Sequence, residues 1–378
     1  MSQNRDTDRA VAYHDSTKHS YWSVRTTPHY LDWENKPSPF KVYPDIEPIR
    51  LPQDLLRSGA AAFQAITHDV TAQADRSIPG LDHLASILFF SAGVTKQKSY
   101  PGGEIYFRAA ACAGALYPVE TYVVTRELEG LRPGLYHFNP GDFSLRLLRE
   151  GDQRPLVLRA TAGNEQAATA PVMLVYTAIT WRSAWKYRAR SYRYHFWDNG
   201  MIVANAMAIA SAHGLASHLI MGFKEDEIDN LLGIDGEKEL SLSLLTIGSD
   251  QGSKVSEAEA GATAGLDLKS IPLSRQEVDY PIIREMHRAS SFEDRDEVIQ
   301  WRSVSTGSPF IESKGKLIPL ASFPPDALSE ISIEEDILRR ASTRRFAAKA
   351  VSFEELSLLL DTSTRGIQAD FLNPAGAQ

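Results

Sequence analysis

An almost unbroken apolar run at residues 170–180 (APVMLVYTAIT) constrains the fold of this chain more than any other segment. It is shorter than the roughly 20 apolar residues that span a bilayer, and it matches a strand buried on both faces. A second apolar stretch, residues 198–215 (DNGMIVANAMAIASAHGL), is typical of a helix that ends at Gly214 and is buried on more than one side. The sequence therefore predicts a large core that contains this strand and this helix.

Other segments with regular patterns flank this pair. Residues 81–93 (LDHLASILFFSAG) predict a helix that stops at Gly93, and residues 225–233 predict a shorter helix. All of these elements precede residue 250, where the pattern changes. Strands are expected at residues 119–126, 134–139, 143–150, 216–223 and 240–248.

The chain divides into four parts. Residues 1–55 form an arm rich in aromatic residues and proline, which we expect to pack on a domain, and residues 56–250 form that domain. Residues 251–330 lack strong periodicity and indicate a linker or a wrapping segment. Residues 331–378 resume a clear pattern, in which SFEE predicts a capping box for a helix after Val351.

This last part also repeats a piece of the domain. LASILFFSAGV from Leu84 is followed by CAGALYP, and LSLLLDTSTRG from Leu356 is followed by PAGAQ. A second copy that begins and then stops explains both matches. We therefore expect an incomplete second domain, a helix–loop piece that must dock on the first domain or stay mobile.

The composition restricts the class of protein. Hydrophobic residues make up 43% of the chain, charged residues 23%, and the formal net charge is −8. These values are typical of a soluble globular protein and argue against a nucleic-acid or anionic-membrane binder. A single cysteine excludes an internal disulfide framework, and no pattern supports a metal site. The amino terminus is polar, so we expect no signal peptide and a cytoplasmic location.

Residues 107–120 (FRAAACAGALYPVE) place small side chains between Arg108 and Glu120, just before a predicted strand. Gly114 and Pro118 interrupt what would otherwise favour a helix. One interpretation is a loop whose N–H groups, with Arg108, hold a phosphate or the polar edge of a flavin ring. The other is a tight helix–strand junction in which the alanines simply pack.

Residues 181–200 (WRSAWKYRARSYRYHFWDNG) are rich in cations. In a continuous helix, Arg182, Lys186, Arg190 and Arg193 would form one stripe, which like-charge repulsion destabilises unless an anion binds there. Neighbouring positive charges also disfavour an ammonium at Lys186, so its amine could take a proton from carbon. A solvated basic face over packed aromatic residues is an equally good interpretation.

A third cationic segment, LRRASTRRF, surrounds Ser342 with two arginine pairs. Guanidinium groups pair with phosphate oxygens, so the segment could clamp a phosphate, or it could be an ordinary basic helix start. The arginines are Arg339, Arg340, Arg344 and Arg345.

Together these segments resemble a known family. YHDSTKHS, LASILFFSAGVTK, FRAAACAGALYPVETYVV, GLYHFNP, WKYRARSYRYHFWDNG and GLASHLIMGF occur in this order over roughly residues 13–250. The order is similar to that of the SagB/ThcOx-type branch of the nitroreductase-like FMN flavoproteins. The resemblance implies an α+β fold with an antiparallel-rich central sheet flanked by helices, usually paired as a dimer with FMN at the interface.

The resemblance also implies functional residues. Lys186 and Tyr187 match a pair that serves as base and proton relay in azoline oxidation. The positions that match flavin-binding residues are Arg76, Ser77, Arg108, Ala113, Gly114, Ala115, Leu116, Ser217, Met221 and Gly222.

Two positions depart from the family pattern. Only DRSIP, with Arg76 and Ser77, stands where a phosphate-clamping arginine motif is expected, and Cys112 replaces the usual serine of the flavin loop. The arginines around Ser342 could reach the FMN phosphate of the first domain instead, in the same chain or in a dimer mate.

The expected function is that of an FMN-dependent oxidoreductase that dehydrogenates a peptide-derived or other small substrate. One alternative is an NAD(P)H-dependent nitro- or quinone-reductase, which would not need Lys186 and Tyr187. Another is a non-catalytic flavin-fold scaffold that binds a peptide or a partner enzyme. The expected partners are a second copy or a tandem domain, and a cyclodehydratase, with no nucleic acid and no membrane.

Overall fold

The fold is described from a computed structural model of the chain. The residues that it describes are 6–26, 29–67, 76–100, 103–263, 265–266, 268–303, 315–323, 330–364 and 366–372.

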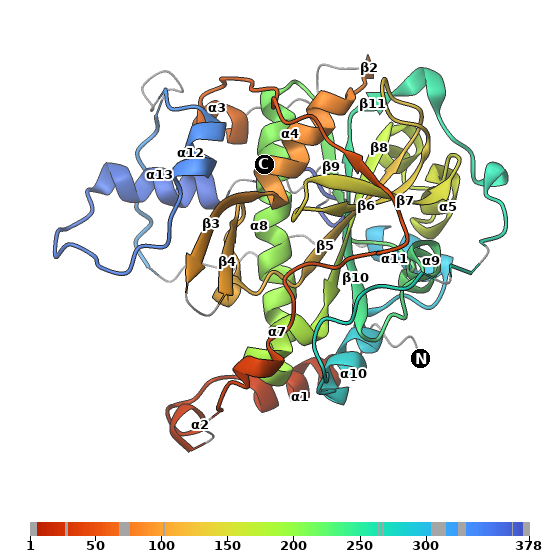
Figure 1. Cartoon of the computed structure of the whole chain (residues 1–378). Helices are drawn as coiled ribbons and strands as arrows, with labels where there is room; N and C mark the ends of the chain where they lie inside the picture. The colour runs from red at the N-terminus through yellow and green to blue at the C-terminus, as the bar shows by residue number, and fades with distance from the viewer. Residues whose placement is uncertain are drawn as a thin grey trace.

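Within these residues, seven strands form one antiparallel sheet at the centre of the molecule (Figure 1). The strand order is β1–β7–β6–β5–β8–β10–β9, so β8 is an interior strand and β9 lies at one edge. The expected α+β fold with an antiparallel sheet is confirmed. The strands are β1 Pro48–Arg50, β5 Val119–Thr125, β6 Gly134–Asn139, β7 Ser144–Glu150, β8 Val172–Ile179, β9 Ser217–Ile220 and β10 Glu239–Ile247.

The apolar run in β8 follows from helices on both faces of the sheet. Val172, Leu174 and Tyr176 join one core with helices α4 and α8, whereas Met173 and Val175 join another with α5 and α9. Because neither face of the strand meets solvent, neither requires polar residues. The helices are α4 Leu81–Ala92, α5 Arg154–Ala160, α8 Ser191–Ala212 and α9 Glu225–Leu232.

The predicted elements are present, with shifts at their ends. The helix expected over 81–93 is α4, and Gly93 caps it, as predicted. The helix expected over 198–215 starts earlier, at Ser191. The sequence did not reveal the hairpin of β3 (Val94–Tyr100) and β4 (Gly103–Arg108), because its largely exposed strands carry no buried apolar pattern.

The N-terminal arm and the segment after residue 250 both pack on the domain. The arm supplies helices α1 (Thr7–Thr17) and α2 (Tyr21–Thr26) and strand β1. The later segment supplies α10 (Pro281–Ser290), which packs against α1, and α11 (Arg295–Ser303). These two helices were not predicted.

Helix α12 (Ile333–Arg339) of the C-terminal part, residues 331–378, docks on the domain, whereas α13 (Phe353–Thr364) is mostly exposed. Helix α12 buries Ile333 and Ile337 in the core that contains α4 and α8. Helix α13 begins with the predicted capping box, because Ser352 and Glu355 each accept the other's main-chain N–H. Of the described helices, none is long and apolar enough to cross a membrane.

Candidate functional site

A break at Arg188 separates two helices within residues 181–200. Helix α7 (Thr180–Tyr187) ends there, and a single turn, η4 (Arg188–Arg190), joins it to α8. The φ of Arg188 is 52°, a left-handed value that a β-carbon disfavours. The expectation of one continuous cationic stripe is therefore wrong.

The arginines of this region point in different directions as a result. Arg182 is fully buried in the core. Arg190 Nη1 donates to the main-chain oxygen of Thr17 at 2.8 Å, and Arg193 Nη2 donates to Thr17 Oγ1 at 2.9 Å. These two arginines thus fasten the end of helix α1 to η4 and α8.

Glu120 lies at the centre of a buried charge network. Arg182 donates to one carboxylate oxygen of Glu120 and to the main-chain oxygen of Tyr117, and His137 Nε2 lies 2.6 Å from the other carboxylate oxygen. Burial alone would raise the pKa of Glu120, but the positive charges around it, Arg182 first, outweigh burial and lower that pKa to about 2. The ionised carboxylate therefore holds Arg182 against the end of the loop at residues 112–117.

That loop has an unusual backbone. Gly114, Ala115 and Tyr117 have φ values of 68°, 52° and 51°. Left-handed values are costly for the two residues that carry a β-carbon, so contacts with the rest of the protein must hold them. One such contact is Leu116, which is buried with Trp181 of α7.

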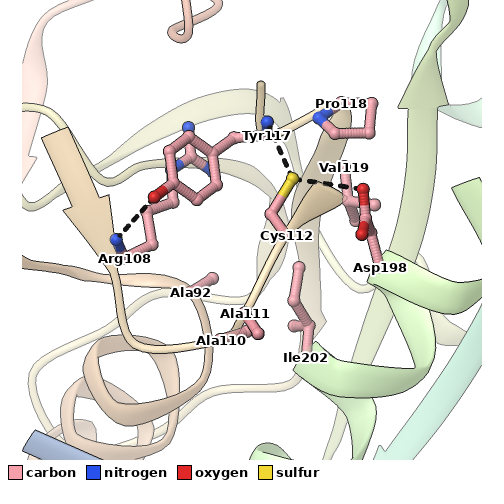
Figure 2. Close-up of a pocket in the computed structure, with 10 residues that line it drawn as sticks. All are labelled: Ala92, Arg108, Ala110, Ala111, Cys112, Tyr117, Pro118, Val119, Asp198 and Ile202. Atoms are coloured by element: carbon pink, nitrogen blue, oxygen red, sulfur yellow. Dashed lines mark hydrogen bonds between the residues drawn. The ribbon is translucent and has the colours of Figure 1, made fainter. Parts of the chain in front are cut away.

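Asp198 of α8 fastens the start of the loop (Figure 2). Its carboxylate accepts the Ala113 N–H at 2.8 Å. It also accepts the Cys112 thiol at 3.1 Å, and Cys112 Sγ accepts the Tyr117 N–H at 3.1 Å, as Figure 2 shows. Burial raises the pKa of the Cys112 thiol, which therefore stays protonated and able to donate. Cys112 thus makes both the donor and the acceptor contact that a serine could make here.

A small cavity lies beside this contact (Figure 2). Its free volume is only about 10 Å³, roughly enough for one water molecule, whereas cavities that enclose ligands usually measure about 300–1,000 Å³. A cofactor with a three-ring system would therefore have to lie outside it. The cavity is lined by Ala92, Arg108, Ala110, Ala111, Cys112, Tyr117, Pro118, Val119, Asp198 and Ile202.

Gly114 brings the loop against Lys186 and Tyr187. A β-carbon at position 114 would lie 2.7 Å from Tyr187 Oη and 3.1 Å from Lys186 Nζ, so the bare main chain faces both polar groups. Both side chains are half-buried. Burial raises the pKa of Tyr187 to about 12, so the phenol keeps its proton at neutral pH. The structure thus brings together three of the predicted site residues.

The predicted residues Ser217, Met221 and Gly222 lie on β9 and just after it, at the edge of the sheet. Ser217 pairs with Ile247 of β10. The main-chain N–H groups of Met221 and Gly222 both donate to the carboxylate of Asp370, at 2.8 and 3.0 Å. The chain's own C-terminal part therefore occupies these two donors.

Arg76 and Ser77 form the short strand β2 (Arg76–Ser77), which pairs with β11 (Ser249–Asp250). The Arg76 side chain is exposed. Ser77 Oγ is buried, and it has no hydrogen-bond partner among the described residues.

Arg108 is buried and bonded inwards. Its guanidinium donates to the main-chain oxygen of Pro39 at 2.6 Å and lies 4.8 Å from the centre of the Tyr117 ring. From the C-terminal part, Arg340 Nη2 donates to the main-chain oxygens of Arg108 and Ala109, at 3.2 and 3.3 Å. The other members of the predicted arginine clamp, Arg339, Ser342, Arg344 and Arg345, are exposed.

Sequence analysis missed Asp198 and Asp370. The sequence gives one indication of Asp198, which is an acidic residue at the start of an apolar helical stretch. A carboxylate that is buried there must be hydrogen-bonded, because burial of an unpaired charge is costly. Asp370 had none, because the main-chain N–H groups that it accepts, those of Met221 and Gly222, lie 149 and 148 residues earlier in the chain. Within the described ranges, no group of three or more His, Cys, Asp or Glu side chains could hold a metal ion.

Comparison with known proteins identifies the family. The model of the nitroreductase family matches residues 75–249. A protein of Methanocaldococcus jannaschii that is named as a nitroreductase is 31% identical over 206 residues, which cover 54% of this chain and 93% of that protein. The chain belongs to the nitroreductase family.

Two further proteins match over different lengths. The trifolitoxin-processing protein TfxB of Rhizobium leguminosarum bv. trifolii is 28% identical over 173 residues, which cover 44% of this chain and 46% of TfxB. This chain thus spans less than half of the length of TfxB. A crystal structure of a nitroreductase from Anabaena variabilis superposes with a TM-score of 0.69 and 27% identity, and covers 94% of this chain and 68% of that chain.

Proposed function

We propose that this nitroreductase-family protein is an FMN-dependent oxidoreductase that dehydrogenates a peptide-derived or other small substrate. The observation that carries the proposal is the approach of Gly114 to Lys186 Nζ and Tyr187 Oη. This approach places the Gly114 main chain, the Lys186 amine and the protonated Tyr187 phenol next to one another in a half-buried position. The similarity to TfxB, which is named for processing trifolitoxin, supports a peptide-derived substrate.

The residues of the loop fit a flat cofactor. Ala113, Gly114 and Ala115 carry at most a methyl group, so a ring can approach the main chain of the loop on the side that Lys186 and Tyr187 leave free. Met221 and Gly222 offer two adjacent N–H donors that suit the polar edge of a flavin. FMN, when bound, would supply the acceptor for a hydride.

The phosphate of FMN needs cationic or hydroxyl partners. The exposed guanidinium of Arg76 suits this role, as does Ser77 Oγ, which has no hydrogen-bond partner in the described part of the chain. Arg340 reaches the main chain that leads into the loop, so it is our proposed second cation for the phosphate.

Lys186 is the proposed base. An amine can accept a proton from a carbon next to an azoline nitrogen or sulfur, provided that the substrate lies against it. Tyr187, with a pKa of about 12, holds its proton and can orient the substrate or pass a proton on. Asp198 holds the loop and so keeps the Gly114 main chain in place. The side chains of Lys186 and Tyr187 therefore stay in contact with a fixed stretch of main chain.

The first test is cofactor binding. Purified protein that is incubated with FMN and passed through a desalting column should retain a yellow chromophore, at up to one FMN per site. Titration monitored by the quenching of flavin fluorescence gives the affinity. Retention of no flavin would overturn the proposal and favour the scaffold alternative, which stoichiometric binding of a partner without flavin would support.

The second test separates dehydrogenation from simple reduction. Lys186→Met and Tyr187→Phe should each lower the rate at which azoline-containing peptides bleach bound FMN by about 100-fold or more, because they remove the base and the relay. The NAD(P)H-driven reduction of a quinone should survive in both variants. Matched controls are Lys254→Met and Tyr30→Phe, whose side chains are exposed. Full peptide dehydrogenation in the Lys186 variant would contradict the assigned base.

A nitro- or quinone-reductase remains the second candidate function, since the M. jannaschii relative bears that name. It shares the flavin loop, so cofactor binding alone does not separate the two. Quinone reduction that is retained in both variants, together with no peptide dehydrogenation in the wild type, would favour it.

We also propose a protein partner. The exposed face of α13 carries Leu356, Leu359 and Leu360, and exposed leucines of this kind suit a second copy or a tandem domain. A cyclodehydratase that makes the azoline is the proposed source of the substrate.

A further inference from the structure

A segment of the C-terminal part lies along the free edge of β9. The Leu219 N–H donates to the main-chain oxygen of Gln368 at 2.8 Å, and the Asp370 N–H donates to the main-chain oxygen of Leu219 at 3.0 Å. Leu219 and Ala369 form a parallel bridge, and Ala369 is buried in the core next to α8. The segment thus adds a short strand to the sheet by the mode in which extended peptides bind sheet edges.

The Asp370 carboxylate adds a specific contact to this pairing. It accepts the N–H groups of Met221 and Gly222, and Arg302 Nε of α11 donates to it at 3.2 Å. The Asp370 side chain is only 2% exposed. Hydrogen bonds to an ionised carboxylate are stronger than neutral ones, so this side chain anchors the segment.

We propose that the edge of β9, the N–H groups of Met221 and Gly222 and the Arg302 guanidinium form a docking site for an extended segment that carries a carboxylate. Residues 366–372 are its internal ligand. The site is distinct from the loop at residues 112–117, and Arg302 and Asp370 belong to no predicted cofactor contact.

One consequence rests on the proposed function. If Met221 and Gly222 donate to FMN, those two N–H groups cannot donate to Asp370 at the same time. The docked segment and the cofactor then exclude each other, and FMN binds fully only after Asp370 leaves. The apparent affinity for FMN is then the intrinsic affinity multiplied by the fraction of molecules in which the segment is not docked.

The experiment uses the full chain and the variants Asp370→Ala and Asp370→Asn. Amide hydrogen exchange at Met221 and Gly222, measured without FMN, should accelerate about tenfold or more in Asp370→Ala, because both N–H groups lose their acceptor. FMN titration should show binding about tenfold tighter. Asp370→Asn keeps one acceptor oxygen, so its exchange rates and FMN affinity should lie between those of the wild type and Asp370→Ala. This variant still tests the proposal if the alanine variant does not fold. The exposed Asp54→Ala serves as the charge-matched control and should leave both measurements unchanged.

A peptide probe tests the site directly. A synthetic peptide with the sequence of residues 366–372, GIQADFL, should slow the exchange of both amides in Asp370→Ala and compete with FMN, and the same peptide with Asn for Asp should not. Unchanged exchange in both Asp370 variants overturns the docking site. Faster exchange with unchanged or weaker FMN binding overturns the competition alone. Faster exchange in a protein that binds no FMN in any form supports the docking site and shows that the proposed function has failed.

Discussion

Replacing Glu120 by alanine should lower the free energy of unfolding by about 3–5 kcal/mol, the range measured when one partner of a buried ion pair is removed. Glu120 is the carboxylate that neutralises the fully buried Arg182, and it also accepts from His137. Without it, Arg182 remains in the core with no counter-charge. Urea unfolding at neutral pH measures the loss. The control Glu237→Ala removes an exposed ion pair with Arg288 and should change stability little.

A second substitution at this position, Glu120→Gln, should alter the response of stability to acid. Glu120 has a pKa of about 2 in the folded protein, below its ordinary value of 4.5. A lowered folded-state pKa gives stability that is complete above about pH 4.5 and is lost as the pH falls towards 2. Glu120→Gln removes the titrating group, so its stability should fall less steeply over this range than that of the wild type. Equal acid slopes in the two proteins would show that Glu120 is not the group that titrates.

Gly114→Ala should strongly lower the rate of catalysis although it changes no charge. The added methyl group would lie 2.7 Å from Tyr187 Oη, so the phenol or the loop must move. Displacement of a catalytic group by about 1 Å can cost about 100-fold in rate, and we expect a loss of this size in peptide dehydrogenation. The left-handed φ of 68° adds about 1–2 kcal/mol of strain for a residue with a β-carbon.

Gly200→Ala is the matched control for this substitution. Gly200 lies in α8, and a β-carbon there would meet no atom within 4 Å. The same chemical change should therefore leave activity intact and raise stability by about 0.5–1 kcal/mol. A Gly114 variant with full activity and unchanged FMN affinity would rule out the packed arrangement of loop, lysine and tyrosine.

The sequence predicts best those elements whose residue pattern reflects burial alone and does not depend on which particular segment covers them. β8 is almost entirely apolar because both of its faces are covered, and Gly93 follows the last residue of α4 and caps it. The break at Arg188 could not be predicted, because a left-handed φ at a non-glycine residue is imposed by packing and not by local preference. The predicted cationic stripe was wrong because it assumed that helical spacing continues across this break.

The residues of the candidate site could be predicted from the sequence, but the contacts that hold them could not. Gly114, Lys186 and Tyr187 were predicted by their resemblance to family motifs, and the structure brings them together. The contacts that hold them are long-range pairings, such as the Ala113–Asp198 hydrogen bond between residues 85 positions apart. A composition or spacing rule cannot identify such a partner, since any acid on several helices could reach the same N–H group.

The docked segment has a second consequence, which concerns solubility. An edge strand with free N–H and C=O groups is a template for pairing with another chain, and proteins guard such edges with short strands or a covering segment. Here β1, at one edge, is only three residues long, and residues 368–370 cover β9 at the other. A molecule that releases this segment therefore exposes a strand edge, so that opening the β9 site also removes a guard against edge-to-edge aggregation.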